Sequence, residues 1–243
     1  QLKAPDYSVN WEEGKKLISQ KTKMIIINTP HNPTGTILSR DDMLELEKIT
    51  SESEIIVLSD EVYEHIIFDQ IEHESICRYK GLAARSMAVF SFGKTFHVTG
   101  WKMGYCIGPK ELTKEFRKVH QFNVFSSNHP LQHALADYLE DREQYLSISS
   151  FYQKKREVFQ QAIRGSRFKI IPCSGTYFQL LSYATISQES DVLFAERLVK
   201  EHSIAAIPVS VFYNSPLDEK VLRFCFAKKE ETLQNAAEIL CSV

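Results

Sequence analysis

The sequence lacks several features that would place it in a specialised class of protein. Its five cysteines are far apart and form no C-x-x-C pair, which argues against a disulfide framework or a zinc site and favours the reduced thiols of a cytoplasmic protein. No apolar run is long enough to span a membrane. The formal net charge is -2, so no basic surface for nucleic acid or acidic lipid is evident. Repeats, low-complexity tracts and Gly/Ser-rich linkers are also missing.

What remains has the composition of a globular protein, 43% hydrophobic and 25% charged. Up to about Cys106, short apolar runs alternate with helical patterns, which indicates βαβ units and a mostly parallel sheet. The continuous apolar runs are typical of strands buried on both faces. We expect an α/β protein in which residues 1–140 are the back portion of a large domain, and residues 141–243 are a connecting helix and a small α+β domain.

The individual elements follow from apolar spacing and from capping residues. Ser39 is expected to cap the first long helix, because Asp41 and Asp42 would lie in its first turn. The expected strands are 24–27, 55–58, 87–90, 103–107, 168–171, 176–181, 204–207 and 221–226. The expected helices are 40–51, 111–122, 131–139, 143–163, 191–201 and 230–240.

Three of the expected parallel strands run directly into polar turns. The first turn contains Asn32, the second contains Asp60 and Tyr63, and the third contains Ser91 and Lys94. Ligands of open α/β sheets bind outside the carboxyl ends of the strands, so we expect these turns to converge on one site. Each residue also has an ordinary explanation, since Asp60 could cap a helix, Tyr63 could belong to the core, and Asn32 could serve its own turn.

The combined set of side chains suits a pyridine cofactor with an aldehyde and a phosphate. Such a group needs a carboxylate at its ring nitrogen, donors at its ring oxygen, cations and hydroxyls at its phosphate, and a lysine for its aldehyde. Lys94 would have to lose its proton to attack the aldehyde, which requires its pKa to fall from ~10.4 toward ~7–8. Lys102 is a second cation that would help, although both lysines could instead be exposed loop residues.

Four motifs resemble those of the fold type I, class I/II aminotransferases. They are Asn-Pro-Thr-Gly at 32–35, Ser-Asp-Glu-Val-Tyr at 59–63, Ser-Phe-Gly-Lys-Thr at 91–95 and Thr-Gly-Trp-Lys-Met-Gly-Tyr at 99–105. The sequence is most similar to the branch with methionine aminotransferases, glutamine transaminase K and kynurenine aminotransferases. The resemblance implies transamination between a neutral, sulfur-containing or aromatic amino acid and a 2-oxo acid, with pyridoxal 5'-phosphate as cofactor.

The resemblance also implies a role for each matching residue. Lys94 would hold the cofactor as a Schiff base and shuttle the α-proton, and Asp60 would pair with the pyridinium nitrogen. Asn32 and Tyr63 would bind the ring oxygen, Ser91 and Lys102 the phosphate, and Arg223 the α-carboxylate of the substrate. A carboxylate suits the guanidinium fork of Arg223, which could otherwise form a structural ion pair. No metal ion is implied.

Other family features have no counterpart in this sequence, which begins with Gln1. Members of the family carry an N-terminal arm, a small-residue phosphate loop, an aromatic ring that stacks on the pyridine, and a tyrosine offered across a homodimer. We expect the chain to be a fragment without this N-terminal part. It should therefore retain the cofactor weakly or not at all and be poorly active or inactive by itself, although the full-length protein would be an active homodimer.

Three other interpretations were compared with transamination. β-Elimination from cysteine S-conjugates or cystathionine would use the same cofactor and the same lysine, and no residue separates the two reactions. The presence of Lys94, Asp60, Asn32 and Arg223 argues against a truncated, catalytically incompetent scaffold, but the missing N-terminal part keeps this alternative open for the fragment. A nucleotide-binding Rossmann protein is disfavoured because no G-x-G-x-x-G motif opens a helix.

Overall fold

The computed structural model describes residues 2–243, which divide into two compact units. We call residues 9–30 and 37–148 the parallel-sheet unit. Within the described residues, the antiparallel-sheet unit contains residues 149–243 together with two short segments, 2–8 and 31–36. Each unit has its own four-stranded sheet.

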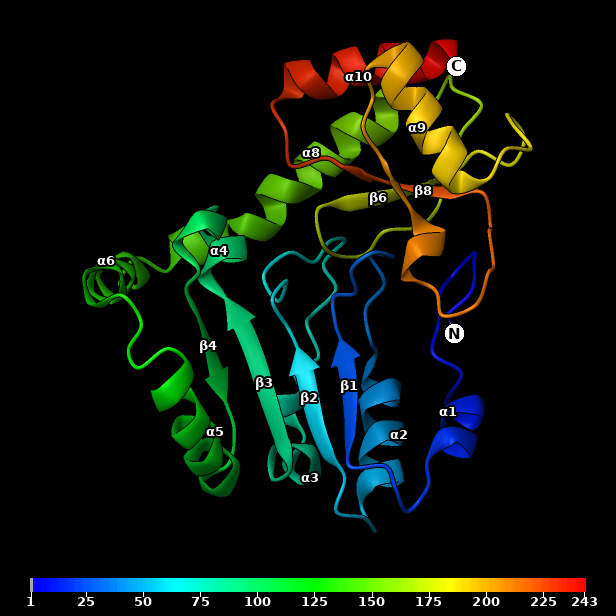
Figure 1. Ribbon diagram of the computed structural model, residues 1–243. Coiled ribbons are helices and arrows are strands. Elements are labelled where there is room, and N and C mark those ends of the chain that lie inside the picture. Colours follow the sequence, from blue (N-terminus) through cyan, green and yellow to red (C-terminus); the bar gives the residue numbers. More distant parts are fainter. Residues whose placement is uncertain (1) are drawn as a thin grey trace. The chain divides into compact units, whose positions relative to one another are not determined.

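The parallel-sheet unit has a sheet with the strand order β1-β2-β3-β4 (Figure 1). The first three strands are parallel, and β4 is antiparallel to β3 at the edge. The strands are β1 (Met24–Asn28), β2 (Ile56–Asp60), β3 (Ser86–Ser91) and β4 (Gly104–Ile107). The helices are α1 (Trp11–Leu17), α2 (Arg40–Thr50), α3 (Lys80–Ala83), α4 (Phe92–Thr95), α5 (Lys110–Asn123), α6 (His129–Leu139) and α7 (Glu143–Leu146).

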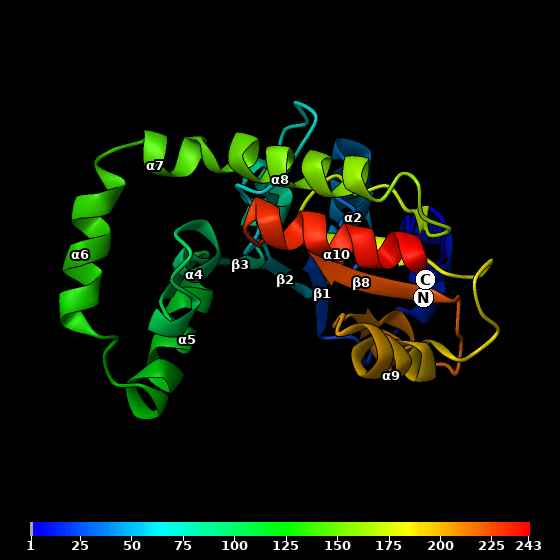
Figure 2. The ribbon, with the colours of Figure 1, turned by 90° about the horizontal axis from the view of Figure 1, so that it is seen from above.

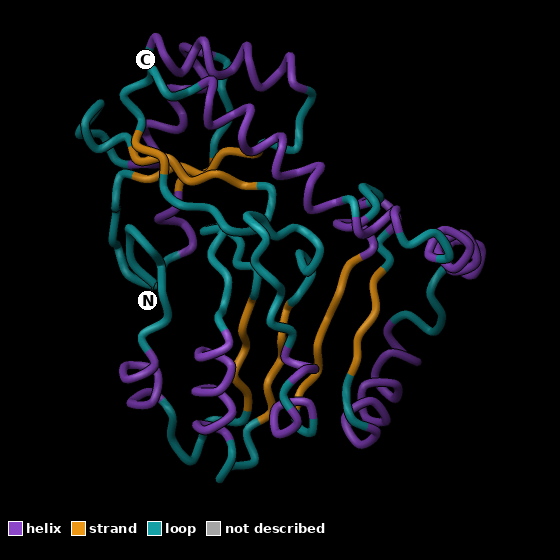
Figure 3. The backbone as a smooth tube through the Cα atoms, turned by 180° about the vertical axis from the view of Figure 1, so that it is seen from behind, coloured by secondary structure: helices purple, strands orange, loops and turns teal. Residues whose placement is uncertain are grey.

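Parallel order places the carboxyl ends of β1, β2 and β3 at one edge of this sheet. Asn28 pairs with Asp60, and Asp60 pairs with Val89, so the three strand ends are nearly level. The loops that leave these ends can be followed from the same edge in Figure 3. The expected mostly parallel α/β arrangement is confirmed.

The core of this unit lies on one face of its sheet. It contains Met43 and Leu46 of α2, Leu82 of α3, and inward-facing strand residues, with Ile25 and Ile27 packed against it. Burial alternates along the strands, so that Val57 and Ser59 are buried while their neighbours are half-buried. One face of β2 and β3 is therefore buried and the other is half-buried, so the expectation that both faces are covered is met only in part within the described chain.

The antiparallel-sheet unit has the strand order β5-β6-β8-β7. Its strands are β5 (Lys169–Ile170), β6 (Phe178–Ser182), β7 (Ile207–Pro208) and β8 (Val221–Cys225), and its helices are α8 (Ile148–Ala162), α9 (Asp191–His202) and α10 (Glu230–Ser242). Seen from above, α8 and α10 lie next to each other, and α9 lies on the other side of β8 (Figure 2). Phe159 of α8 and Phe168 contact Phe224 of β8, which defines the helix-covered face.

Most expected elements are present, with three informative differences. The helix expected over 143–163 is divided at Ser147, whose hydroxyl and amide both donate to Glu143 O, at 2.6 and 3.1 Å. The strand expected from Thr176 begins at Phe178, because Thr176 has φ +67°. The strand expected over 204–207 is reduced to Ile207–Pro208, following the left-handed cap of α9 at Ser203.

Candidate active site

Asp60 is the last residue of β2, and few polar groups offset the burial of its carboxyl group. Among the described residues it accepts one side-chain hydrogen bond, from Val62 N at 3.3 Å. Burial raises the pKa of Asp60, while the Val62 bond and the nearby charge of Lys94 lower it. A cationic group placed against this carboxylate would therefore be strongly favoured.

Lys94 lies in α4, the short helical turn that follows β3. Its Nζ lies 5.5 Å from the centre of the Tyr63 ring, which is buried with 3% of its surface exposed. Three of the predicted residues, Asp60, Tyr63 and Lys94, are therefore brought together at the carboxyl edge of the parallel strands. The amine lies near the face of the phenol ring, and its charge lowers the pKa of the Asp60 carboxyl group.

A cavity of about 360 Å³ adjoins Lys94 in the same unit. Its lining includes the cationic groups of Lys94 and Lys102 and the hydroxyls of Ser91 and Thr99. Lys102 has φ +55°, so the chain turns sharply where it presents this side chain. Two ammonium groups and two hydroxyls make a cavity suited to an anion such as a phosphate.

Gly93 lies in the wall of this cavity, close to the Thr99 backbone and the Ser91 side chain. A Cβ atom at this position would lie 3.0 Å from the Thr99 Cα and 3.3 Å from the Ser91 Oγ, which is closer than ordinary van der Waals contact. The Cβ atom of any other residue would therefore push against the Thr99 backbone and against the hydroxyl of Ser91, the residue predicted to bind the phosphate. The residues present fit a phosphate-bearing pyridine, with Ser91 and Lys102 for its phosphate and Asp60 for its ring nitrogen.

The other two predicted residues, Asn32 and Arg223, belong to the antiparallel-sheet unit. Arg223 is the central residue of β8, and its Nη1 donates to Asn32 Oδ1 at 2.5 Å. The guanidinium carbon lies 4.1 Å from the centre of the Phe178 ring and 5.4 Å from that of Phe212. Because Leu222 and Phe224 face the helices, Arg223 points to the opposite face of the sheet. Aromatic faces and an amide thus hold the guanidinium in one orientation.

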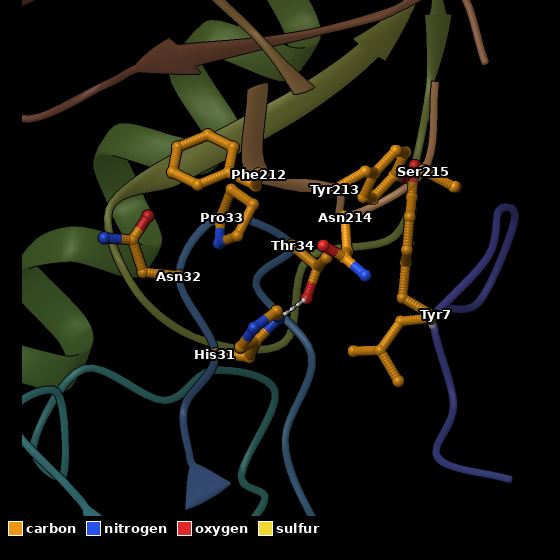
Figure 4. Close-up of a pocket in the computed structure, with 10 residues that line it drawn as sticks. Tyr7, His31, Asn32, Pro33, Thr34, Phe212, Tyr213, Asn214 and Ser215 are labelled. Atoms are coloured by element: carbon orange, nitrogen blue, oxygen red, sulfur yellow. Dashed lines mark hydrogen bonds between the residues drawn. The ribbon is translucent and has the colours of Figure 1, made fainter. Parts of the chain in front are cut away.

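A cavity of about 510 Å³ lies in the same unit, and Phe212 and Asn32 are part of its wall (Figure 4). None of the residues that line it carries a charge at neutral pH. Its only ionisable base is His31, whose pKa burial lowers to about 4 and whose Nδ1 lies 2.7 Å from Thr34 Oγ1. The cavity is suited to a neutral group.

Sequence reasoning missed a buried polar pair next to Asp60. Glu61 is fully buried, and its carboxylate contacts His73 Nε2 at 2.7 Å. The two residues are separated by 12 positions, and the only sequence signal was the position of Glu61 directly after Asp60. Within residues 2–243 no group of three or more His, Cys, Asp or Glu side chains could hold a metal ion.

Residues 2–240 match the family described as aminotransferase class I and II. The chain belongs to this family. Family membership confirms the resemblance carried by the four motifs.

Individual aminotransferases are similar in both sequence and structure. The methionine aminotransferase of Escherichia coli (strain K12) is 48% identical over 240 residues, which cover 98% of this chain and 62% of that protein. Human kynurenine–oxoglutarate transaminase 3 is 33% identical over 255 residues, 97% of this chain and 56% of that protein.

Two solved structures extend the comparison. The Escherichia coli protein whose crystal structure and reactivity identified a methionine aminotransferase function has a TM-score of 0.97 at 47% identity, covering 100% of this chain and 64% of that one. N-Succinyldiaminopimelate aminotransferase from Mycobacterium tuberculosis has a TM-score of 0.93 at 28% identity, covering 99% of this chain and 63% of that one. This aminotransferase-family chain thus has the fold type I architecture and spans between 56% and 64% of the length of these relatives.

No helix in the described part of the chain is long and apolar enough to cross a bilayer. None of the five cysteines, which all lie within residues 2–243, forms a disulfide.

Proposed function

We propose that this chain is the part of a pyridoxal 5'-phosphate-dependent aminotransferase that carries its catalytic lysine. The reaction would exchange the α-amino group of a methionine-like neutral amino acid for the oxygen of a 2-oxo acid. The observation that carries the proposal is the grouping of Lys94 with Asp60 and Tyr63 beside a cavity lined by two lysines and two hydroxyls.

The cofactor, when bound, supplies an aldehyde for an amine and a protonated pyridine ring that accepts electrons from the substrate α-carbon. The Nζ of Lys94 is the amine for that aldehyde and the base that moves the α-proton. The carboxylate of Asp60 keeps the ring nitrogen protonated, and Tyr63 donates to the ring oxygen. Ser91 and Lys102 bind the phosphate.

The substrate class is supported by the antiparallel-sheet unit. Arg223 presents a guanidinium that matches a carboxylate, and Asn32 would bind the ring oxygen of the cofactor. The adjoining cavity contains no charged lining residue, which favours a neutral substrate side chain. The 48% identity to a methionine aminotransferase supports the same class.

Assembly, location and completeness are proposed on weaker grounds. We propose a homodimer because members of the family that this chain resembles offer residues across a dimer. We propose a cytoplasmic location because the five cysteines are far apart in the sequence and form no C-x-x-C pair. We also propose that the 243-residue chain holds the cofactor weakly, since its relatives are longer.

The proposal is tested by trapping the cofactor on the chain. The protein is incubated with pyridoxal 5'-phosphate, reduced with borohydride and digested, and the modified lysines are identified by mass spectrometry. We expect a substoichiometric label concentrated at Lys94, lost in Lys94→Ala and retained in Lys200→Ala, whose side chain is 73% exposed. A label spread evenly over exposed lysines and unchanged in Lys94→Ala contradicts the assignment. Stoichiometric yellow colour contradicts weak retention alone.

Turnover is then measured on a protein extended to the length of its relatives. Methionine with a 2-oxo acid should give the corresponding 2-oxo acid of methionine and the new amino acid in equal amounts. Absence of both products in a protein that carries the Lys94 label contradicts the proposed substrate class.

A further inference from the structure

Glu61 follows Asp60 directly, and its side chain is fully buried. Its Oε1 accepts hydrogen bonds from Ser59 Oγ at 2.8 Å and from Ile76 N at 3.0 Å, and its Oε2 contacts His73 Nε2 at 2.7 Å. Although burial opposes ionisation, the bonds from His73 and Ile76 hold the pKa of Glu61 below its usual value. The side chain is therefore a buried carboxylate with three donors.

This carboxylate closes the loop that follows β2. Ile76, which begins the next 3-10 turn, is bound to the residue with which the loop starts. A second glutamate, Glu64, accepts a hydrogen bond from the Tyr105 hydroxyl of β4 at 2.9 Å. The intervening residue Tyr63 is buried between these two attachments. Side-chain hydrogen bonds thus hold the loop at Glu61, at Glu64 and at Ile76.

His73 directs its hydrogen bonding at Glu61. Its side chain is 13% exposed, and its Nδ1 is buried without a hydrogen-bond partner among the described residues. An ionised carboxylate can only accept, so the proton of the 2.7 Å contact is on Nε2. A buried Nδ1 without a hydrogen-bond partner costs free energy. The hydrogen bond from Nε2 to Glu61 offsets that cost.

We propose that Glu61 and His73 are positioning residues for Asp60 and Tyr63. This inference rests on the proposed function, in which Asp60 and Tyr63 contact the pyridine ring. Asp60 has one side-chain hydrogen bond among the described residues, so the direction of its carboxylate depends on the backbone. The hydrogen bonds to the Glu61 side chain hold the backbone at residue 61. They thereby fix the peptide group next to Asp60 and the direction of the Asp60 side chain. Neither Glu61 nor His73 lines the cavity next to Lys94, so both would act through Asp60 and Tyr63.

The inference predicts a specific ranking of variants of the 243-residue chain. Glu61→Gln removes the buried charge, and His73→Leu removes the donor. His73→Gln keeps a donor amide and should restore part of the wild-type behaviour. Glu72→Gln is the matched control, since it makes the same charge change in the same loop at a side chain that is 82% exposed. Folding of each variant is checked by circular dichroism. Ser59→Ala, which keeps the charge of Glu61 and removes one of its hydrogen-bond donors, replaces any variant that does not fold.

The first measurement is amide hydrogen exchange, which needs no cofactor. The amides of Val62 and Ile66 bond to Asp60 Oδ1 and Tyr63 O, so their protection reports the order of the two positioned residues. We expect exchange about tenfold faster in Glu61→Gln and His73→Leu, because each loses a hydrogen bond to a charged group. Glu72→Gln should match the wild type. Unchanged exchange at both amides in the folded variants overturns the inference, whether or not the chain binds cofactor.

The second measurement is spectroscopic. Titration with pyridoxal 5'-phosphate should show an apparent dissociation constant about tenfold higher in Glu61→Gln and His73→Leu. The pH at which the absorbance of the Lys94 adduct changes should also move, because Asp60 no longer faces the ring nitrogen correctly. A wild-type binding constant and titration in both variants contradicts the positioning role. Failure of the wild type to form any adduct contradicts the proposed function, and the exchange measurement then decides the inference alone.

Discussion

The carboxyl group of Asp60 is half-buried with one side-chain hydrogen bond among the described residues, and burial raises its pKa. A carboxyl group whose folded pKa is raised binds its proton more tightly in the folded state than in the unfolded state. Its ionisation therefore lowers the stability of the folded chain as the pH rises above the unfolded value of about 3.9. A binding residue is here a source of instability in the unliganded protein.

Replacing Asp60 by Asn should accordingly stabilise the chain and weaken cofactor binding. Asn keeps an oxygen that can accept from Val62 N, but it has no charge to bury. We expect a higher melting temperature than wild type at pH 7 and a smaller difference at pH 4, measured by differential scanning calorimetry without cofactor. The control Asp41→Asn, an exposed residue in the first turn of α2, should change little. A lower melting temperature for Asp60→Asn at pH 7 contradicts the argument.

Sequence reasoning placed several of these residues correctly within one unit, for a physical reason. Asp60 and Lys94 each follow a short apolar run, and parallel strands bring such positions to one edge. The same reasoning could not find Glu61 and His73 as a pair. His73 lies in a loop without periodicity, so only the folded loop brings it to Glu61.

At the scale of the element, local hydrogen bonding explains where the observed helices agree with those expected from the sequence and where they differ. Helix α2 begins where Ser39 was expected to cap it, because a side-chain oxygen at that position satisfies a free amide. The single helix expected over 143–163 was wrong, because apolar spacing continues through Ser147 and does not register its hydroxyl bond to Glu143 O. Apolar periodicity predicts which face of a helix is buried and is insensitive to such breaks.

The cap of α2 gives a quantitative test at this scale. Ser39 Oγ accepts from Asp42 N at 3.2 Å, and Asp42 Oδ2 accepts from Ser39 N at 2.8 Å, which forms a capping box. Ser39→Ala should lower the free energy of unfolding by about 1 kcal/mol. Urea denaturation followed by the fluorescence of Trp11, whose indole donates to Asp42 at 2.7 Å, would measure it.

Asp41→Asn again serves as the control, since Asp41 lies in the same turn but outside the box. It should cost only a few tenths of a kcal/mol, about the size of a helix-dipole interaction. Equal losses in the two variants would mean that charge at the helix end, and not the reciprocal box, stabilises α2.

At the scale of the whole molecule, two features were hidden from the sequence. The segment 31–36 interrupts the parallel-sheet unit and groups with residues 149–243. Gly35, at φ +74°, accepts hydrogen bonds from Ser174 N and Gly175 N, and a Cβ there would lie 2.8 Å from Cys173 Sγ. Contacts between residues so far apart in sequence leave no periodic signal, although Gly in a turn with two prolines indicates a constrained backbone.

The second feature that the sequence did not reveal is that β1 lies at the edge of the sheet of the parallel-sheet unit and carries exposed apolar side chains. β1 pairs only with β2 among the described strands, and it carries neither charge nor proline to protect that edge. Ile25 and Ile27 pack against the core, so the pleat turns Met24 and Ile26 to the other face, where they are 49% and 67% exposed. An uncharged apolar edge strand favours pairing with another copy of the chain.

We therefore expect the chain to self-associate, and Ile26→Lys to weaken that association about tenfold, since burying an isoleucine contributes about 1.5–3 kcal/mol. Sedimentation velocity over a range of concentrations would measure the midpoint of association, with circular dichroism to confirm that the fold is kept. Leu17→Lys is the matched control, because Leu17 is 82% exposed on α1 and lies on no sheet edge. If the two variants shift the midpoint equally, net charge explains the effect. If neither shifts it, β1 is not the surface through which copies meet.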